Sequence, residues 1–312
     1  MQSTSVKSKR PLPARIGRRL AEDWPLYVLL LPGFAYILVF NYFPMYGVQI
    51  AFKDYSTRLG IWGSKWVGFK HFVRFLSYPA FFQIIVNTLT LSLYSIATFP
   101  CAVIAALLIN ELDSARFKRV VQMISYAPHF ISTVVICGML KIFFARSNGL
   151  INNVIEMLGG ARYDFLSDPK CFAHIYVWSG VWQGLGWNTI IYLAALAGVS
   201  PEIQEAARID GANRLQIVWY VNLPTIMPTV MTMLILSCGS VLSVGFEKVY
   251  LMQNSLNLSA SEVISTYVYE VGVNGAQFSY SSAIGLFNTV VNIVILMLVN
   301  ALSRRLSSVS IW

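Results

Sequence analysis

The sequence predicts an all-α integral membrane protein with six transmembrane helices, and three observations support that fold class. The chain has 312 residues with a mean hydropathy of +0.60, and only 12% of them are charged, about half the share found in soluble domains. Six mainly apolar stretches each approach the ~20 residues that a helix needs to cross a bilayer. The basic residues lie largely between these stretches and at the chain ends, as they do in membrane proteins.

Two other classes of protein fit the composition less well. A large soluble enzyme would not contain such long uncharged runs, because it has to cover its core with polar surface. The net charge of +9 could indicate a nucleic-acid partner in a soluble protein, but here the basic residues occupy positions that orient a membrane protein. We therefore expect membrane lipid, and no nucleic acid, around this chain.

The first predicted span covers residues 24–43, behind a basic tail of residues 1–23. It is long enough to cross the membrane and no small-residue cleavage site follows it, so we interpret it as a retained helix and not as a signal peptide. The other spans are expected at 82–109, 120–144, 172–196, 225–249 and 281–302. The chain then divides into the tail, a transmembrane domain (24–303) that includes a long connection at 198–224, and a C-terminal tail (304–312).

The charge distribution predicts that both termini lie in the cytoplasm. With the N-terminus inside, the inner segments carry thirteen basic residues and the outer segments carry ten. The inner ones are Lys7, Lys9, Arg10, Arg15, Arg18, Arg19, Arg116, Lys118, Arg119, Arg208, Arg214, Arg304 and Arg305. The outer ones are Lys53, Arg58, Lys65, Lys70, Arg74, Lys141, Arg146, Arg162, Lys170 and Lys248. The positively charged flank of the first helix favours this orientation, and an even number of spans returns the chain to the same side.

Motifs for catalysis, nucleotide binding and metal binding are missing from the sequence. The string at 60–65 has the wrong spacing for a P-loop, and neither H-E-x-x-H nor G-x-S-x-G occurs. The three histidines lie in different segments, and no two of the four cysteines form a C-x-x-C pair. We expect no catalytic residue, no cofactor and no metal. The spans also offer no strong candidate for the buried carboxylate that an ion-driven transporter needs.

The connection at 198–224 carries strong helix signals. Ser200 is a good N-cap and Pro201 suits a first helical turn. Gly211 can adopt the left-handed conformation that ends a helix. We therefore predict one helix from Pro201 to Ile209, and a second that begins near Arg214 and stops before Pro224.

The side chains of the first of these helices favour a protein partner over lipid. Ala206 and Ala207 are small, so another surface can approach the backbone closely, and Glu205, Arg208 and Asp210 place charges of both signs beside them. A helix lying on lipid would present a Lys-rich polar face and large apolar residues instead.

At this point the sequence resembles a known family. The connection reads Glu205-Ala206-Ala207, three residues, Gly211, nine residues, Val221, one residue and Leu223-Pro224. This pattern is similar to the EAA loop of ABC importer permeases, with valine where the family has isoleucine. Further stretches resemble the LplB-like branch of carbohydrate permeases: 42–47, 51–55, 66–72, 126–132, 209–214, 245–247, 266–269 and 278–281.

The resemblance implies the fold, the mechanism and the partners. The chain would have the type I ABC importer permease fold and would sit in a bacterial cytoplasmic membrane. It would pair with a second, different permease, and two copies of an ATPase would dock from the cytoplasm. An extracellular solute-binding lipoprotein would deliver the substrate. The positions that would couple the chain to the ATPase are Glu205, Ala206, Ala207, Asp210, Gly211, Leu223 and Pro224.

The branch also implies an oligosaccharide or sugar derivative as cargo. Trp182 and Asn188 in the fourth span, with Asn288 and Asn292 in the sixth, are candidates for the substrate path, because sugars stack on aromatic rings and bond to amides. The competing interpretation is that Trp belongs to an interfacial belt and Asn joins helices. Other functions left open are an ABC permease for a peptide or polyamine, a secondary transporter, and a membrane enzyme or assembly factor.

Overall fold

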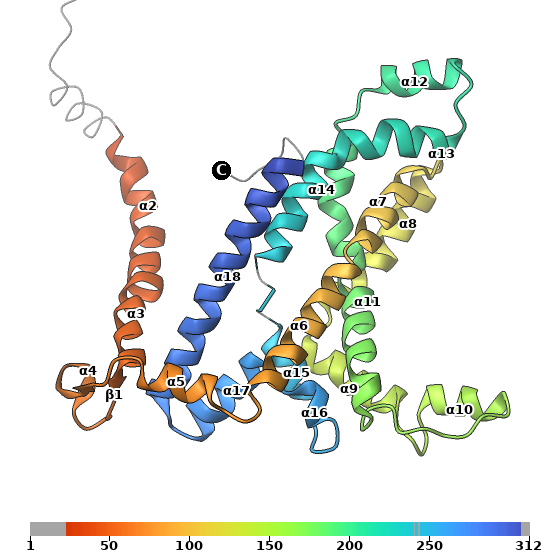
Figure 1. Ribbon diagram of the computed structural model, residues 1–312. Helices are drawn as coiled ribbons and strands as arrows, with labels where there is room; N and C mark the ends of the chain where they lie inside the picture. Colours follow the sequence, from red (N-terminus) through yellow and green to blue (C-terminus); the bar gives the residue numbers. More distant parts are fainter. Residues whose placement is uncertain (1–22, 240, 243, 307–312) are drawn as a thin grey trace, which may run out of the picture.

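The computed structural model describes residues 23–306 apart from 240 and 243, and side chains as far as residue 301. The predicted tails at 1–23 and 304–312 therefore lie almost wholly outside the described residues. Long helices run between two ends of the molecule (Figure 1). One end carries α12 (Pro201–Ile209), and most of the short elements gather at the other end.

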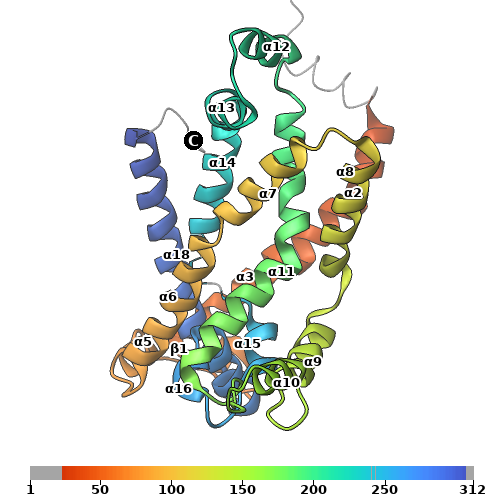
Figure 2. The ribbon, with the colours of Figure 1, turned by 90° about the vertical axis from the view of Figure 1, so that its right-hand side faces the viewer.

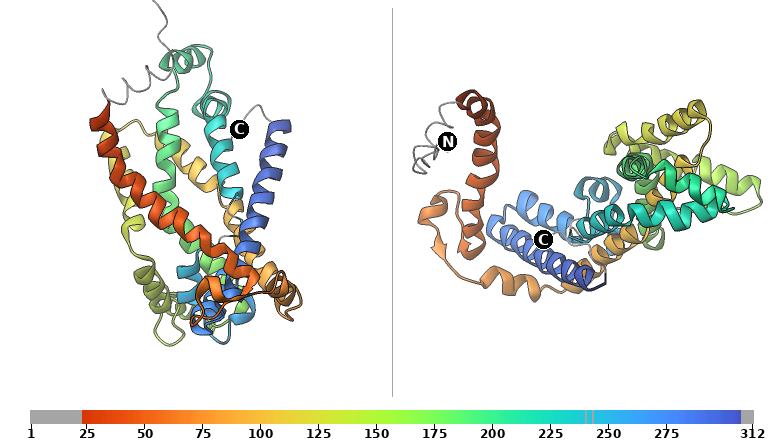
Figure 3. Two further views of the ribbon diagram at one scale, coloured as in Figure 1. Left: turned by 90° about the vertical axis from the view of Figure 1, so that its left-hand side faces the viewer. Right: turned by 90° about the horizontal axis from the view of Figure 1, so that it is seen from above.

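The first predicted span corresponds to a helical run of 29 residues, Trp24–Phe52. It consists of α2 (Trp24–Ile37), a π-helical turn η1 (Leu38–Tyr42), α3 (Phe43–Met45) and a 3₁₀ segment η2 (Tyr46–Phe52). None of the residues of α2, η1 and α3, all of which the structure describes, is buried. At the α12 end, α2 stands apart from the final helix α18 (Phe278–Leu306), and only at the opposite end does η2 contact α18 (Figure 3).

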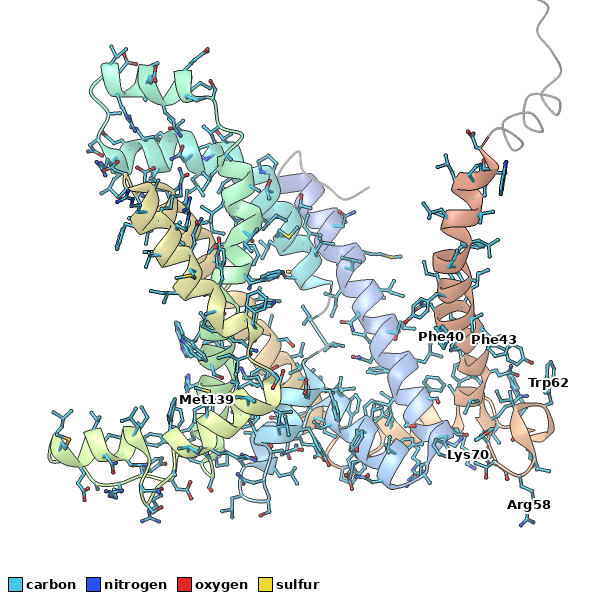
Figure 4. The ribbon with its side chains drawn as sticks, turned by 180° about the vertical axis from the view of Figure 1, so that it is seen from behind. Phe40, Phe43, Arg58, Trp62, Lys70 and Met139 are labelled. Carbon is cyan, nitrogen blue, oxygen red and sulfur yellow. The ribbon has the colours of Figure 1, made fainter. Side chains whose placement is uncertain are left out.

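A short hairpin follows at the end of the molecule opposite α12. Its strands β1 (Lys53–Asp54) and β2 (Lys65–Trp66) pair antiparallel around α4 (Gly60–Gly63), and α5 (Lys70–Leu76) comes next. The Lys70 Nζ lies 2.7 Å from Asp54 Oδ2, and this hydrogen bond holds the pKa of the Asp54 carboxyl below its ordinary value. Arg58 and Trp62 project outward beyond Lys70 in Figure 4.

The second predicted span corresponds to two helices, α6 (Phe81–Ala97) and α7 (Pro100–Asn110), which together form an apolar run of 30 residues. Pro100 occupies the first turn of α7, where its missing N–H leaves no hydrogen bond unmade.

The third span was predicted as one helix over 120–144, and this is wrong. The structure has α8 (Ala115–Tyr126) with a 3₁₀ turn η3 (Ala127–Phe130), and then α9 (Thr133–Phe143), bent by 97° from it. Pro128 favours a helix end because it cannot donate to the preceding turn. Ser132 then starts a new helix, since its side chain accepts a hydrogen bond from the Val135 N–H.

The fourth span is a single long helix, α11 (Pro169–Leu196), preceded by a short helix α10 (Leu150–Met157). Its 28 residues extend about 42 Å at 1.5 Å per residue, enough to cross a membrane. Among the described residues, however, four helices are both long and apolar enough to span, or five if the bent α8–α9 pair is one span, and α11 is not among them. The tryptophans, glycines and amides in α11 keep its hydropathy below that of the four apolar spans.

The fifth span was predicted at 225–249, with a separate helix that stopped before Pro224, and both predictions are wrong. The helix runs from α13 (Arg214–Ile217) through a π-helical turn η4 (Val218–Asn222) into α14 (Leu223–Cys238). Pro224 lies just after the π-helical turn η4, where the regular hydrogen-bond pattern of the helix is already interrupted, so the run can accommodate a residue without an N–H.

The fifth segment then ends earlier than predicted. The described residues between Cys238 and Phe246 are not helical, and α15 (Phe246–Met252) follows. The helix α18 approaches closely where α14 ends, since a Cβ on Gly239 would lie 2.7 Å from Leu296 Cδ1 and the leucine side chain would have to shift. The Leu242 N–H, which no helix satisfies, donates to Asn292 Oδ1 of α18 at 2.9 Å.

The remaining elements complete the core. They are α16 (Leu258–Ser261), α17 (Ile264–Tyr269), a π-helical turn η5 (Glu270–Asn274) and α18. One apolar cluster joins α7, α11 and α14, a second joins α6, α11 and α15, and a third joins α5, α6, α17 and α18. The helix α11 contributes to two of the three clusters and runs beside α6 and α7 (Figure 2).

Candidate functional site

The helix α12 forms as the sequence predicts. It starts at Pro201 after an extended Ser200, although the Ser200 side chain makes no capping hydrogen bond. It ends at Gly211, whose φ of +84° is the left-handed conformation. Two backbone bonds close that end, from the Gly211 N–H to the Arg208 carbonyl and from the Ala212 N–H to the Ala207 carbonyl. Together they make a Schellman motif, which fixes the direction in which the chain leaves the helix.

The surface of α12 is open. None of its nine residues, all of which the structure describes, is buried. The side chain of Ile209 is 86% exposed, and Ile203 and Glu205 are exposed beside it. The helix α12 has a well-formed C-terminal cap but buries none of its side chains against the rest of the chain. This arrangement fits a surface that another protein covers.

A buried amide ties α12 to the long helices. Asn222, which is fully buried, accepts a hydrogen bond from Gln204 Nε2 at 2.8 Å and donates one to Glu111 Oε1 at 3.1 Å. Gln204 belongs to α12, Asn222 ends η4, and Glu111 follows α7. Arg214 adds a second, exposed link to Asp113 at 2.8 Å. We call the chain Gln204–Asn222–Glu111 the amide clamp; nothing in the sequence pattern identified it.

The predicted coupling residues do not all lie at one place. A small hollow of about 270 Å³ brings together Ala207, Asp210, Gly211 and Val221. Glu205 and Ala206 lie on the exposed surface of α12. Leu223 packs against the apolar cluster of α7, α11 and α14, and Pro224 is exposed at the start of α14.

A cavity of about 910 Å³ lies among α6, α7, α11, α14 and α15. Its wall is mainly apolar, with hydroxyls from Ser92 and Ser95 and amides from Gln183 and Asn188. A cavity of this size with a few polar groups is typical of a small-molecule site. The non-helical residues between α14 and α15 form part of the wall, so the break in the fifth segment helps to make the cavity.

The four predicted substrate-path residues are divided by the structure. Asn188 lines the cavity, whereas Trp182, Asn288 and Asn292 are not among its lining residues. Trp182 is exposed on the outside of α11. Asn292 accepts the Leu242 N–H, so it has the helix-joining role of the competing interpretation. The buried Oδ1 of Asn288 has no hydrogen-bond partner among the described residues.

Two cavity residues were not predicted as sugar contacts. Lys248 had been assigned to an outer connection, but it is buried in α15 and its side chain lines the cavity. The Lys248 Nζ donates a hydrogen bond of 3.0 Å to the backbone carbonyl of Tyr176 in α11. The described residues contain no group of three His, Cys, Asp or Glu side chains that could hold a metal ion.

Residues 87–308 match the family model of the "Binding-protein-dependent transport system inner membrane component". This match covers more than half of the chain, and the chain therefore belongs to that family of ABC importer permeases. The membership confirms the resemblance of the EAA loop and the prediction of a non-catalytic transport subunit in the inner membrane.

Curated relatives cover almost the full length. The chain is 41% identical over 309 residues to the polygalacturonan/rhamnogalacturonan transport system permease protein YteP of Bacillus subtilis (strain 168), covering 99% of this chain and 96% of that protein. It is 46% identical over 287 residues to the protein LplB of the same strain, covering 92% and 90%. The resemblance to the LplB-like branch is thereby confirmed.

Solved structures share the fold. One chain of a bacterial ABC transporter that imports the acidic polysaccharide alginate superimposes with a TM-score of 0.87 at 39% identity, covering 94% of this chain and 99% of that one. A chain of the alginate transporter in complex with an alginate pentasaccharide-bound periplasmic protein gives the same TM-score at 38% identity, covering 95% and 100%. The chain thus has the type I importer permease fold.

Proposed function

We propose that this permease carries an oligosaccharide, delivered by an extracellular solute-binding lipoprotein, through a pore that it forms with a second, different permease. Two copies of an ATPase dock on the cytoplasmic face and supply the energy. The observation that carries this proposal is α12: a capped, exposed helix with the EAA pattern, fastened by the amide clamp to the helices around the cavity.

The proposed topology has six spans with both termini and α12 in the cytoplasm. The bent α8–α9 pair and the 28-residue α11 supply the two spans beyond the four most apolar helices. In Figure 1 the start of α2, the end of α18 and α12 all lie at one end of the molecule, which favours a common side of the membrane. The exposed apolar faces of α2 and α18 would then contact lipid or the partner permease.

Coupling would begin at the exposed face of α12. Glu205, Ala206 and Asp210 present charge and small side chains to the ATPase. Closure of the ATPases on ATP would displace α12, and the amide clamp would pass this movement to α14 and to the α7–α8 connection. Such a rigid-body switch needs a firm link between the moving helix and the spans.

The sugar class is supported by two observations. The relatives are named for polygalacturonan/rhamnogalacturonan and for alginate, all of them polysaccharides. The cavity offers the Asn188 and Gln183 amides and the serine hydroxyls that sugar hydroxyls would bind. Asn288, with its unpartnered Oδ1, remains a candidate for the path where the partner permease meets α18.

The test is uptake by the whole transporter in proteoliposomes, with the partner permease, the ATPase and the binding protein supplied. We expect uptake of pectic or alginate-type oligosaccharides that requires ATP inside and the binding protein outside. The variant Glu205→Lys, which reverses a charge on α12, should abolish uptake while the complex stays in the membrane. Uptake that persists without the ATPase and follows an ion gradient would refute the proposal in favour of a secondary transporter.

A further inference from the structure

The cavity contains a buried cation with no matching anion. Lys248 is only 9% exposed, and it is the one charged residue among the described residues that line the cavity. No Asp or Glu of the described residues forms an ion pair with it. A charge taken out of water without a counter-ion is strongly destabilising, so a buried and unpaired lysine in a membrane protein indicates a functional site.

The contacts of Lys248 hold the ammonium in place and leave it able to bind more. The Nζ donates to the Tyr176 carbonyl at 3.0 Å and lies 5.1 Å from the centre of the Tyr176 ring. A Cβ on Gly180, one turn further along α11, would be 3.4 Å from the Nζ. The ammonium therefore lies against the backbone of α11 at a position without a side chain. Of its three N–H donors, one is used in the hydrogen bond to the Tyr176 carbonyl.

Neutral and charged groups in the cavity are placed to receive different parts of a sugar. Gln183 and Asn188 lie further along α11 than Tyr176 and Gly180, and Ser92 and Ser95 lie on α6. These groups can bind hydroxyls. Lys248, at the α15 side, can form a charge-assisted hydrogen bond, which is about twice as strong as a neutral one.

We propose that Lys248 binds a carboxylate of the transported sugar, so that the cargo is an acidic oligosaccharide containing uronate residues. This inference rests on the proposed function and adds its substrate class and a specificity-determining residue. A carboxylate would supply the counter-charge that the described protein residues do not. It is also the anionic group of alginate, the acidic polysaccharide that the structurally similar transporter imports. Sulfate esters share this chemistry and serve as a test arm.

The first experiment compares uptake of trigalacturonate with uptake of neutral galactotriose in the reconstituted transporter. Lys248→Met keeps the length of the side chain and removes the charge, and Lys248→Arg keeps the charge. We expect Lys248→Met to lower trigalacturonate uptake about tenfold or more and to change galactotriose uptake less than twofold, with Lys248→Arg close to wild type. The matched control is Lys141→Met, which removes an exposed lysine of α9 that does not line the cavity.

The second experiment removes the selectivity of the binding protein. Trigalacturonate, its methyl ester and a sulfated galactotriose are titrated directly into the nanodisc-embedded wild-type complex without binding protein. The free acid should bind about tenfold more tightly than the ester, and this difference should vanish in Lys248→Met. This arm decides the question in the wild type even if Lys248→Met fails to assemble.

The outcomes separate the two proposals. Equal losses for acidic and neutral sugars in Lys248→Met, or equal wild-type binding of acid and ester, would overturn the role of Lys248. Equally tight binding of the sulfated sugar would overturn the assignment of a carboxylate. ATP-dependent uptake of neutral sugars alone would overturn this inference and leave the proposed function standing, whereas no ATP-dependent uptake of any sugar would overturn the proposed function itself.

Discussion

Gly211 shows how a single residue sets the geometry of α12. Its φ of +84° lies where residues with a Cβ are disfavoured, and a Cβ built there meets no atom within 4 Å. A substitution at this position therefore acts through the backbone and not through a clash, at about 1–2 kcal/mol. The strain falls on the Schellman motif that orients the chain between α12 and α13.

The variant Gly211→Val should reduce ATP-dependent uptake at least about tenfold while membrane insertion stays normal, because it unfolds the end of α12 without touching the spans. Reconstituted uptake and the yield of the purified complex measure the two effects. The control is Gly138→Val in α9, where a Cβ also meets no atom within 4 Å but φ is not positive. Normal coupling in Gly211→Val would show that the conformation of this turn is dispensable.

The residues that the sequence revealed are those whose signals are local. The positive φ of Gly211 and the start of α12 at Pro201 were predictable, because capping and turn chemistry act over a few neighbouring positions. Asn222 and Lys248 were not, because their partners lie 111 and 72 positions away. At the end of the predicted fifth span a lysine looks like a residue that reaches the membrane surface, until the fold places α15 against α11.

At the scale of the elements, the sequence predicted where apolar segments lie but not where they break. The runs near 24–43, 82–109 and 281–302 correspond to apolar helices of the structure. The third segment bends after the turn that contains Pro128 and the fifth ends at Gly239, although the pattern remains hydrophobic on both sides of each position. Hydropathy averages over such positions, whereas the helix depends on each hydrogen bond and each close contact.

The amide clamp gives a prediction about how elements move together. Asn222→Asp keeps an acceptor for Gln204 but sets a second carboxylate against Glu111, so it should separate the α7 end from η4 and lower uptake more than ATP hydrolysis. The double variant Asn222→Asp with Glu111→Gln exchanges amide and carboxylate, so that the new amide at position 111 donates to the new carboxylate at position 222. We expect it to recover most of the lost uptake.

Measurements of uptake and ATPase activity on the same proteoliposomes test the clamp. The single variant Glu111→Gln is the matched control, since it removes one charge and keeps the shape of the side chain. If the double variant were no better than Asn222→Asp alone, the hydrogen bonds at Asn222 would have no part in coupling.

At the scale of the whole molecule, the exposed apolar surface is that of one subunit of a larger assembly. The described residues of α2 bury nothing, and α18 exposes Val290, Ile293, Val294, Met297 and Leu298. Exposed apolar surface of this extent needs lipid or protein around it. The EAA pattern of the sequence already implied an ABC importer around it, and family membership and the alginate transporter structures support that class of assembly, whereas the apolar faces alone do not identify a partner.

The proposed orientation of the whole molecule can be tested by labelling. On a background without Cys101, Cys137, Cys171 and Cys238, a cysteine at the exposed position of Ile203 should react with a membrane-impermeant maleimide only after the cells are opened. A cysteine at Trp62, exposed at the opposite end, should react in intact cells. Labelling of position 203 from outside would reverse the assigned topology.

The break between α14 and α15 gives the walls of the cavity different mechanical connections to α12. A continuous helix carries a tilt along its whole length, but the hydrogen-bonded rod that starts at Arg214 stops at Cys238. Beyond it, α15 packs on α9 and α17, and Lys248 is tethered to α11. A tilt that enters α14 would thus end at Cys238, whereas α11, which is unbroken from Pro169 to Leu196 just before α12, would carry the same movement to the Tyr176 carbonyl that holds the ammonium.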